Sequence, residues 1–309
     1  MADFLLSRLV SALVVILGVV TLVFLLIHLV PGDPVDVMLG ESARATDREA
    51  LRIALGLNLP VSEQLLVYFS NLAHLDLGRS LYSNLPVSQV LAERIPATLE
   101  LTGAALLCAV LIATPLGIMA AVRRGEAWDW GAMGFSMLGV SIPNFWLGPM
   151  LILLFSLWLG WTPVSGRDSL AGLILPAITL GSAFAAILAR MIRSSLLEVL
   201  GEDYVRTARA KGLSERNVVL RHAMRNAWLP VITLLGLQLG GLLGGAVVTE
   251  IVFDWPGVGS LMIDSIQKRD FPVVQGCVLF ISLVYVLVNT LTDIVYGVVD
   301  PRVRLGGSR

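Results

Sequence analysis

The apolar parts of this chain contain few ionisable residues, and the most informative of these are carboxylates. Glu100 and Glu250 stand near the ends of hydrophobic stretches, and Asp293 follows Asn289 by one helical turn inside another. Ionisable groups inside a membrane are costly and commonly mark pathways or gates. A proton relay needs several carboxylates at depth, whereas two of these three lie near an interface. Glu250, Asn289 and Asp293 are therefore candidates for a pathway or gate, with structural hydrogen bonding as the alternative.

No motif for hydrolysis or metal chemistry accompanies these carboxylates. The sequence has no G-x-x-x-x-G-K-[ST] segment to cradle a nucleotide phosphate, no H-E-x-x-H pair and no G-x-S-x-G elbow. His28, His74 and His222 are far apart in the chain, and Cys108 and Cys277 fall in apolar runs. A cysteine in such a run behaves as a small hydrophobic residue. We expect no catalytic residue, no metal site, no disulfide and no cofactor bound by this chain.

The strongest functional signal is a basic segment between two apolar stretches. Residues 204–230 contain six Arg or Lys residues among good helix formers. The pattern predicts two short helices with a break at Gly212, the second beginning at Ser214 with Glu215 in its first turn. Attraction to anionic lipid would explain the cations, but not the break or the apolar residues. A short helix with a mixed face fits a cleft in a cytoplasmic partner.

The composition predicts that lipid surrounds the elements carrying these residues. The chain has 309 residues, of which 56% are hydrophobic and 15% charged, with a net charge of −1. A soluble domain carries about a quarter charged residues, and a membrane-spanning helix needs about 20 apolar ones. We expect an all-α membrane protein with six transmembrane helices, the third kinked or broken at Pro143 or Pro149. The six stretches are 9–30, 98–122, 132–160, 171–192, 229–250 and 274–299.

The basic residues predict the orientation. With the N-terminus in the cytoplasm, 14 of the 22 Lys and Arg residues lie inside, and short loops decide orientation. Both termini are then cytoplasmic, and the long loop 31–97 is outside, where we expect two short helices. One covers Thr46–Leu55 with a Thr/Asp cap, and the other covers Val61–Leu77. In the second outer segment, 251–273, Gly and Pro predict a tight turn.

Glycines recur on one face of the fifth apolar stretch. Gly236, Gly240 and Gly244 are spaced four residues apart. Small residues on one helical face let backbones approach closely in lipid. The spacing fits packing within one subunit as well as it fits a subunit interface or a moving gate.

The basic segment resembles the EAA loop of ABC-importer permeases, in the form used by the dipeptide/oligopeptide/nickel branch. Ala208 and Gly212 match the second Ala and the Gly of E-A-A-x-x-x-G, whereas Arg206 and Thr207 replace the first Glu and Ala. Further matching stretches are Pro31-Gly32-Asp33-Pro34, Ile95-Pro96-Ala97-Thr98-Leu99, Ile142-Pro143-Asn144-Phe145-Trp146, Leu175-Pro176-Ala177, Trp255-Pro256-Gly257-Val258-Gly259, Arg269-Asp270 and Asp300-Pro301-Arg302. The resemblance covers essentially the whole chain and is closest to the B-type permease of the pair.

The resemblance implies a role and a set of partners. The chain would be a multi-pass permease of the bacterial cytoplasmic (inner) membrane, paired with a homologous second permease. Two cytoplasmic ATPase subunits would bind ATP and Mg²⁺, and a periplasmic or lipid-anchored binding protein would deliver substrate; no nucleic acid is involved. Loop 194–228 would contain the coupling helix. Its contact residues would be Tyr204, Arg206, Ala208, Arg209, Lys211 and Gly212.

The resemblance also implies how the chain is divided into segments and which cargo it transports. Residues 1–30 form the first transmembrane helix, 31–97 the periplasmic loop, 98–300 the five-helix permease core and 301–309 a cytoplasmic tail. Di- or oligopeptides are the expected cargo, with nickel, a nickel chelate or glutathione as alternatives for the same machine. A self-sufficient secondary carrier would need buried ion-coupling residues and inverted repeats, and a non-transporting scaffold would not need Gly- and Pro-rich spans.

Overall fold

The computed structural model describes residues 2–29, 34–39 and 44–299, which form two compact units. One unit comprises Met1–Thr98 and Pro256–Val286, and the other comprises Leu99–Trp255 and Leu287–Arg309. Within the described residues the regular structure is helical, apart from an isolated antiparallel bridge between two loop residues. The fold is therefore all-α, as the apolar stretches predict.

The first unit consists largely of short helices. Its small core packs the start of α5 against α12 and the start of α13, through Val87, Leu91, Val258, Val273 and Cys277. Its elements are α1 (Ala2–Leu29), α2 (Pro34–Leu39), α3 (Ala45–Ala54), α4 (Val61–Ala73), the start of α5 (Val87–Val122), α12 (Val258–Gln267) and the start of α13 (Phe271–Val299).

A buried carboxylate fixes the loop before α5 to the start of α13. Asp270 is 4% exposed, and it accepts hydrogen bonds from Ser80 Oγ and from Leu81 N, the latter at 3.0 Å. Arg269 has φ +54°, which non-glycine residues rarely adopt. The Arg269-Asp270 motif thus forms a sharp turn and holds a loop that lies far away in sequence.

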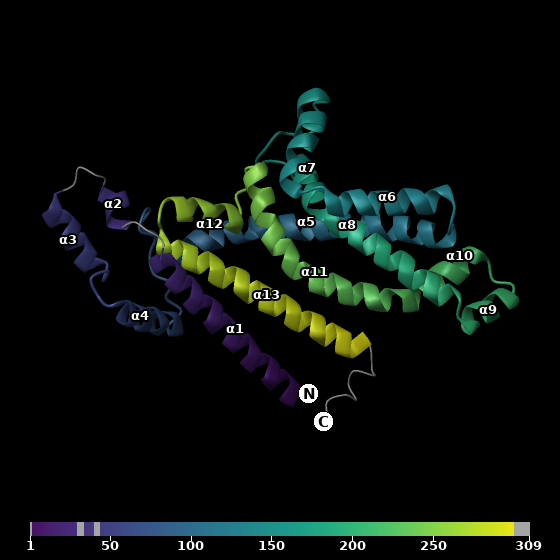
Figure 1. Cartoon of the computed structure of the whole chain (residues 1–309), viewed down its shortest axis with the longest axis horizontal. Helices are drawn as coiled ribbons and strands as arrows, with labels where there is room; N and C mark the ends of the chain where they lie inside the picture. The colour runs from purple at the N-terminus through teal and green to yellow at the C-terminus, as the bar shows by residue number, and fades with distance from the viewer. Residues whose placement is uncertain (1, 30–33, 40–43, 300–309) are drawn as a thin grey trace. The chain divides into compact units, whose positions relative to one another are not determined.

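The second unit is a bundle around α8 (Leu170–Leu200). This helix packs against α6 (Ala127–Ser141) and α11 (Met224–Val252) (Figure 1). Helices α5 and α8 also approach closely, because a Cβ atom on Gly181 would lie only 2.6 Å from the carbonyl oxygen of Ala105. Such small-residue contacts allow the extensive van der Waals packing that holds helices together in lipid.

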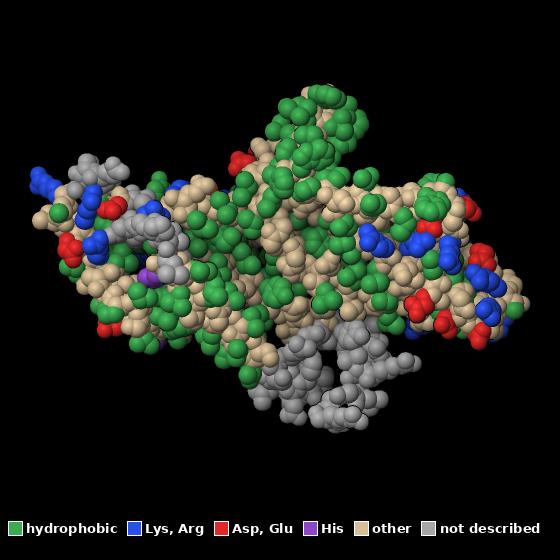
Figure 2. Space-filling view, in the orientation of Figure 1, with side chains coloured by type: hydrophobic (Ala, Val, Ile, Leu, Met, Phe, Trp, Pro, Cys, Tyr) green, Lys and Arg blue, Asp and Glu red, His purple; other side chains and the backbone are tan. Residues whose placement is uncertain are grey.

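The third apolar stretch is broken, as its prolines predict. After α6, helix α7 (Asn144–Leu151) begins behind Pro143 and continues as the π-helix η1 (Ile152–Trp158). The bend between the two halves is 108°. Proline disfavours the helical conformation in the residue before it, which places the break at Pro143, whereas Pro149 lies inside α7. In Figure 2 the projecting α7 and η1 are covered by hydrophobic side chains.

Five of the six expected spans have a helical counterpart of sufficient length. Four segments are long and apolar enough to cross a membrane, and the bent pair counts as a fifth. In α1 the described apolar stretch is shorter, Val10–Leu26. The four unbroken segments are Val87–Val122, Leu170–Leu200, Glu215–Val252 and Phe271–Thr292.

Several boundaries differ from those expected. Helix α5 begins at Val87 rather than at residue 98, because the helix continues beyond its apolar part. The expected Thr/Asp cap of α3 is wrong, since Arg44 occupies the N-cap position and its side chain makes no capping hydrogen bond. Helix α4 ends at Ala73, just before Leu75 with φ +61°. The turn at Asp254 is confirmed by its φ of +49°, but helix α12 follows and was not predicted.

Candidate functional site

The basic segment folds into two short helices on the second unit. Helix α9 (Asp203–Ala210) and helix α10 (Glu215–Asn217) are separated by a turn at Gly212, where φ is +79°. Glycine adopts this left-handed conformation without steric cost. Ser214 is the N-cap residue of α10. The structure thus confirms the predicted break and the predicted start of the second helix.

Helix α9 is amphipathic and firmly seated. Val205 and Ala208 are 0% and 6% exposed, and they belong to the same core cluster as Leu196 of α8 and Met224 of α11. Residues three apart share one face of a helix, so this pair anchors α9. Ala208, expected among the coupling residues, therefore faces its own bundle. The other expected residues, Tyr204, Arg206, Arg209, Lys211 and Gly212, are exposed.

Two polar contacts fix the shape of this loop. Arg209 donates from Nε and Nη2 to the carboxylate of Glu215, at 2.8 and 3.3 Å, across the Gly212 turn. Asn226 Nδ2 donates to the hydroxyl of Tyr204 at 2.9 Å, which ties α9 to α11. Bidentate Arg–carboxylate pairs fix geometry as well as adding energy. The loop is therefore a defined surface on which Lys211 and Gly212 form the exposed corner.

Cations gather on this surface. Figure 2 shows Lys and Arg side chains over the α9–α10 end of the second unit, interspersed with a few acidic ones. A surface of this kind favours a partner with complementary negative charge and speeds its association. The exposed basic residues of the segment are Arg206, Arg209, Lys211, Arg216, Arg221 and Arg225.

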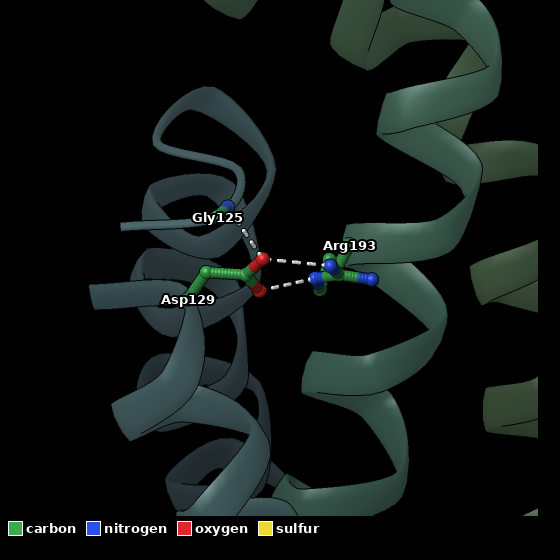
Figure 3. Close-up of polar contacts among 3 residues, drawn as sticks. All are labelled: Gly125, Asp129 and Arg193. Atoms are coloured by element: carbon green, nitrogen blue, oxygen red, sulfur yellow. Dashed lines mark hydrogen bonds and ion pairs between the residues drawn. The ribbon is translucent and has the colours of Figure 1, made fainter. Parts of the chain in front are cut away.

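An ion pair links the start of α6 to α8, the helix that leads into α9 (Figure 3). Arg193 donates to Asp129 through both Nε and Nη2, the second bond measuring 2.8 Å, and Gly125 N donates to the same carboxylate at 3.0 Å. The side chains of Asp129 and Arg193 are 9% and 23% exposed. No pattern in the sequence predicted that Asp129 and Arg193 form a pair. The available signal was a carboxylate between Trp128 and Trp130 at the start of an apolar stretch.

The pathway candidates lie on two different helices. Glu250 is completely buried near the end of α11, and its backbone oxygen accepts a bond from Trp255 N at 2.8 Å. Asn289 is half-buried in α13. Asp293 lies on the same helix, but its side chain is outside the described residues. Their assignment to a pathway or gate stays a prediction.

Glu100, the remaining carboxylate of the apolar stretches, is engaged in an ion pair. Its Oε2 lies 2.6 Å from Arg167 Nη2 and 2.7 Å from Arg167 Nε. Both side chains are about one-third exposed, at 35% and 37%. The pair connects α5 to the segment before α8, and it gives Glu100 a structural role.

The three glycines of α11 do not share one environment. Gly236 is buried, and a Cβ atom there would lie 1.9 Å from Thr292 Cγ2 of α13. Gly244 is exposed, and a Cβ atom there would meet nothing within 4 Å. Gly240 is half-buried. Gly236 therefore serves packing inside the chain, whereas Gly244 leaves a surface open.

Metal-binding and redox groups are sparse in the part of the chain that the structure describes. In residues 2–29, 34–39 and 44–299, as far as their side chains are described, no three His, Cys, Asp or Glu residues are grouped to hold a metal ion. Cys108 and Cys277 are free thiols. The candidate site is therefore the exposed docking surface of α9 and α10, together with the contacts that hold these helices on the bundle.

Family comparison assigns this architecture. Residues 113–305 match the family described as "Binding-protein-dependent transport system inner membrane component". Residues 1–102 match the corresponding N-terminal family of such membrane components. The chain belongs to this permease family. Together with the apolar helices, this makes it a multi-pass protein of the inner membrane.

Curated permeases match nearly the whole chain. It is 45% identical to the dipeptide transport system permease protein DppB of Escherichia coli K12, over 98% of this chain and 99% of that one. It is 47% identical to the di/tripeptide transport system permease protein DppB of Pseudomonas aeruginosa, with the same coverage. The glutathione transport system permease protein GsiC of Escherichia coli O6:H1 is 45% identical, also over 98% and 99%.

A solved transporter shares the permease fold. An inward-facing structure of the MetNI methionine ABC transporter superposes with a TM-score of 0.58, covering 69% of this chain and 97% of that one. The sequences are 19% identical, so this likeness concerns the fold alone.

Proposed function

We propose that this chain is a permease subunit of an ATP-driven importer of di- and oligopeptides and that it forms half of the translocation pathway. The observation that carries the cargo is 45–47% identity, over 98% of the chain, to permeases of dipeptide and di/tripeptide transport systems. A second, homologous permease would supply the other half. An external binding protein would deliver the peptide, as the family description implies.

The power for transport would come from two cytoplasmic ATPase subunits. The sequence contains no G-x-x-x-x-G-K-[ST] motif. In this proposal ATP and Mg²⁺ would bind to the ATPase subunits, and closure of the ATPases would reach this chain mechanically. The exposed face of α9 supports this role, because Val205 and Ala208 connect the helix to the bundle core. The Asp129–Arg193 pair extends the connection from α8 to α6. Rigid elements of this kind carry domain motions between states.

The topology proposed here has six spans, with both termini in the cytoplasm and residues 31–97 in the periplasm. Helix α1, with 28 residues, has the length to supply the first span. The concentration of cations around α9 and α10 supports a cytoplasmic position for that loop. The short helices α2, α3 and α4 would then lie on the outer face.

Glutathione is the second candidate cargo. The glutathione permease matches this chain as extensively as one of the dipeptide permeases does, at 45% identity over 98% of the chain. Glutathione is itself a small peptide with free charged ends, so the same machine could transport either.

Uptake by the reconstituted complex tests both cargoes. Proteoliposomes containing both permeases and both ATPases, with the binding protein outside, receive labelled dipeptide, glutathione or nickel chelate. We expect ATP-dependent accumulation of the dipeptide. If only glutathione or only the nickel chelate accumulated, that compound would be the cargo instead of the dipeptide. Uptake without ATPase subunits would contradict the coupling mechanism. Exchanging the binding protein should change the cargo more than any single substitution in the spans does.

A further inference from the structure

Arg190 is an unpaired cation inside one of the apolar spans. It belongs to α8, and its side chain is exposed. It makes no hydrogen bond, ion pair or ring contact with any residue that the structure describes. Arg193, one turn further along the same helix, is by contrast paired with Asp129 (Figure 3). A charged side chain inside a membrane is costly, and such residues almost always face a bundle interior or a water-filled cavity, where they mark pathways.

Helix α8 is enclosed by three other helices of the second unit, α5, α6 and α11. In its most apolar stretch 50% of the residues are buried, compared with 28–33% in the other three unbroken spans. Each neighbour approaches α8 at a glycine, and distances are measured from the position that a Cβ atom would take there. The contacts are Gly117 of α5 with Ile192 Cβ at 2.7 Å, Gly139 of α6 with Ala186 Cβ at 2.8 Å and Gly241 of α11 with Phe184 Cζ at 3.8 Å.

These contacts leave one face of α8 uncovered, and Arg190 stands on it. Each residue turns an α-helix by about 100°, so Arg190 lies about 160° around α8 from Ile192 and about 120° from Phe184. It lies about 40° from Ala186, at the edge of the surface that α6 covers. Ser194, one turn further along the same face, is also exposed. In Figure 1 α8 runs between α6 and α11 with α5 behind it, and Figure 2 shows basic side chains on this open face.

We propose that this face of α8 lines the translocation pathway and that Arg190 pairs with the terminal carboxylate of a peptide in transit. The inference rests on the proposed function, in which a second permease supplies the other half of the pathway. Charge complementarity carries it, because a guanidinium binds a carboxylate through two parallel hydrogen bonds, and the Ser194 hydroxyl can donate another. Exposed ion pairs are weak, so Arg190 guides the peptide and then releases it.

Uptake by the reconstituted complex tests the role of Arg190. Maximal rates are measured with tritiated leucyl-leucine at a concentration that fully loads the binding protein. We expect Arg190→Gln to lower the rate about ten-fold, the effect of losing one charge-assisted hydrogen bond. Arg190→Lys, which keeps the cation, should stay within about three-fold of wild type. The matched control is Arg44→Gln, which removes an exposed cation outside the spans and should leave the rate unchanged.

A cargo without the carboxylate shows whether Arg190 acts on the peptide. Leucyl-leucinamide, again at full loading of the binding protein, should enter wild-type vesicles about ten-fold more slowly than leucyl-leucine. Arg190→Gln should transport the amide as fast as wild type does, since the interaction is already absent. If Arg190→Gln slowed both cargoes by the same factor, the partner of Arg190 would be a lipid or a protein group, and the proposal would be overturned.

Chemical restoration of the charge tests whether this face meets water. Arg190→Cys is treated with membrane-impermeant methanethiosulfonates, one carrying a trimethylammonium group and one a sulfonate, and treated wild type controls for Cys108 and Cys277. We expect the cationic reagent to restore most of the lost uptake and the anionic reagent to restore none. Absence of any reaction, or equal restoration by both reagents, would also overturn the proposal.

The same measurements separate this inference from the proposed function. If the wild-type complex imports no peptide, the proposed cargo fails. If it imports leucyl-leucine and Arg190→Gln imports it equally well, only the role of Arg190 fails. Gel filtration and basal ATP hydrolysis confirm that each variant assembles with its partners.

Discussion

At the scale of single residues, the pair of Asp129 and Arg193 is much less exposed than the pair of Asp203 and Arg206. The Asp129 side chain is 9% exposed, and its carboxylate accepts bonds from Nε and Nη2 of Arg193 and from Gly125 N. By contrast, Arg206 and Asp203 lie 3.6 Å apart and are 72% and 97% exposed. Exposed pairs contribute little, about 0–1 kcal/mol, whereas breaking a nearly buried pair leaves a charge that neither water nor protein compensates.

Replacing Asp129 should therefore destabilise the permease. We expect Asp129→Asn to lower the free energy of unfolding by about 2 kcal/mol, measured by thermal denaturation in detergent. The matched control, Asp203→Asn, should change it by less than about 0.5 kcal/mol. The charge reversal Asp129→Arg with Arg193→Asp should recover part of the loss. If reversal were no better than the single changes, the two side chains would not act as a pair.

At the scale of elements, the structure shows which residues of α9 and α11 pack against other helices of the same chain. The sequence predicted the break at Gly212 because glycine and the following Ser-Glu are local signals. It did not predict that Ala208 would face inward, because that depends on α8 and α11 packing beneath α9. Similarly, the glycine pattern of α11 identified a close-packing helix, but only the position of Thr292 on α13 distinguishes Gly236 from Gly244.

The corner at Gly212 gives a test of coupling with matched backbone strain. Gly212→Gln and Gly160→Gln both place a side chain at a left-handed position, with φ of +79° and +64°, and a Cβ atom at either position meets nothing within 4 Å. Each should cost about 1–2 kcal/mol of stability. Only the change at Gly212 should also lower transport and substrate-stimulated ATP hydrolysis, by about ten-fold if it removes about 1.4 kcal/mol of ATPase contact. If both changes lowered transport and ATP hydrolysis equally, the loop would serve only as an anchor and not as the coupling contact.

The glycines of α11 allow a second test at this scale. Gly236→Ala should lower stability by about 1–3 kcal/mol, since its Cβ would overlap Thr292 and force repacking. Gly244→Ala should leave thermal stability unchanged, because nothing lies within 4 Å. If Gly244 faces the second permease, Gly244→Leu should reduce co-purification of that subunit. Full recovery of the complex with Gly244→Leu would place the interface elsewhere.

At the scale of the whole molecule, the sequence predicted the helical class and most spans but not every boundary. Hydropathy predicts only the part of a helix that lies in lipid. Helix α5 begins at Val87, before its apolar part, and hydropathy does not predict such an extension. The Asp129–Arg193 pair joins residues 64 positions apart, and no local pattern reports such a distance. Predicted sidedness rests on the distribution of cations, so it calls for a direct measurement.

Cysteine labelling tests the proposed topology. The two native cysteines lie in α5 and α13, where Cys108 is half-buried and Cys277 buried, so neither should react with a membrane-impermeant maleimide. We expect Ser83→Cys to be labelled in intact cells and Ser214→Cys only after the membrane is opened. Both positions are exposed in the folded chain. Labelling of Ser214→Cys in intact cells would invert the topology.

The π-helical segment η2 (Val218–Ala223) links α10 to α11, and it has a consequence for how this chain tolerates changes in length. A π-turn accommodates more residues than an α-turn does, and each residue of an α-helix turns the chain by about 100°. Deleting one residue from η2 can restore regular α-helix, whereas a deletion in the middle of α11 would rotate its packed faces out of register. Natural relatives that differ by a single residue here would keep the orientation of α11, so η2 is a point where the loop and the span can evolve separately.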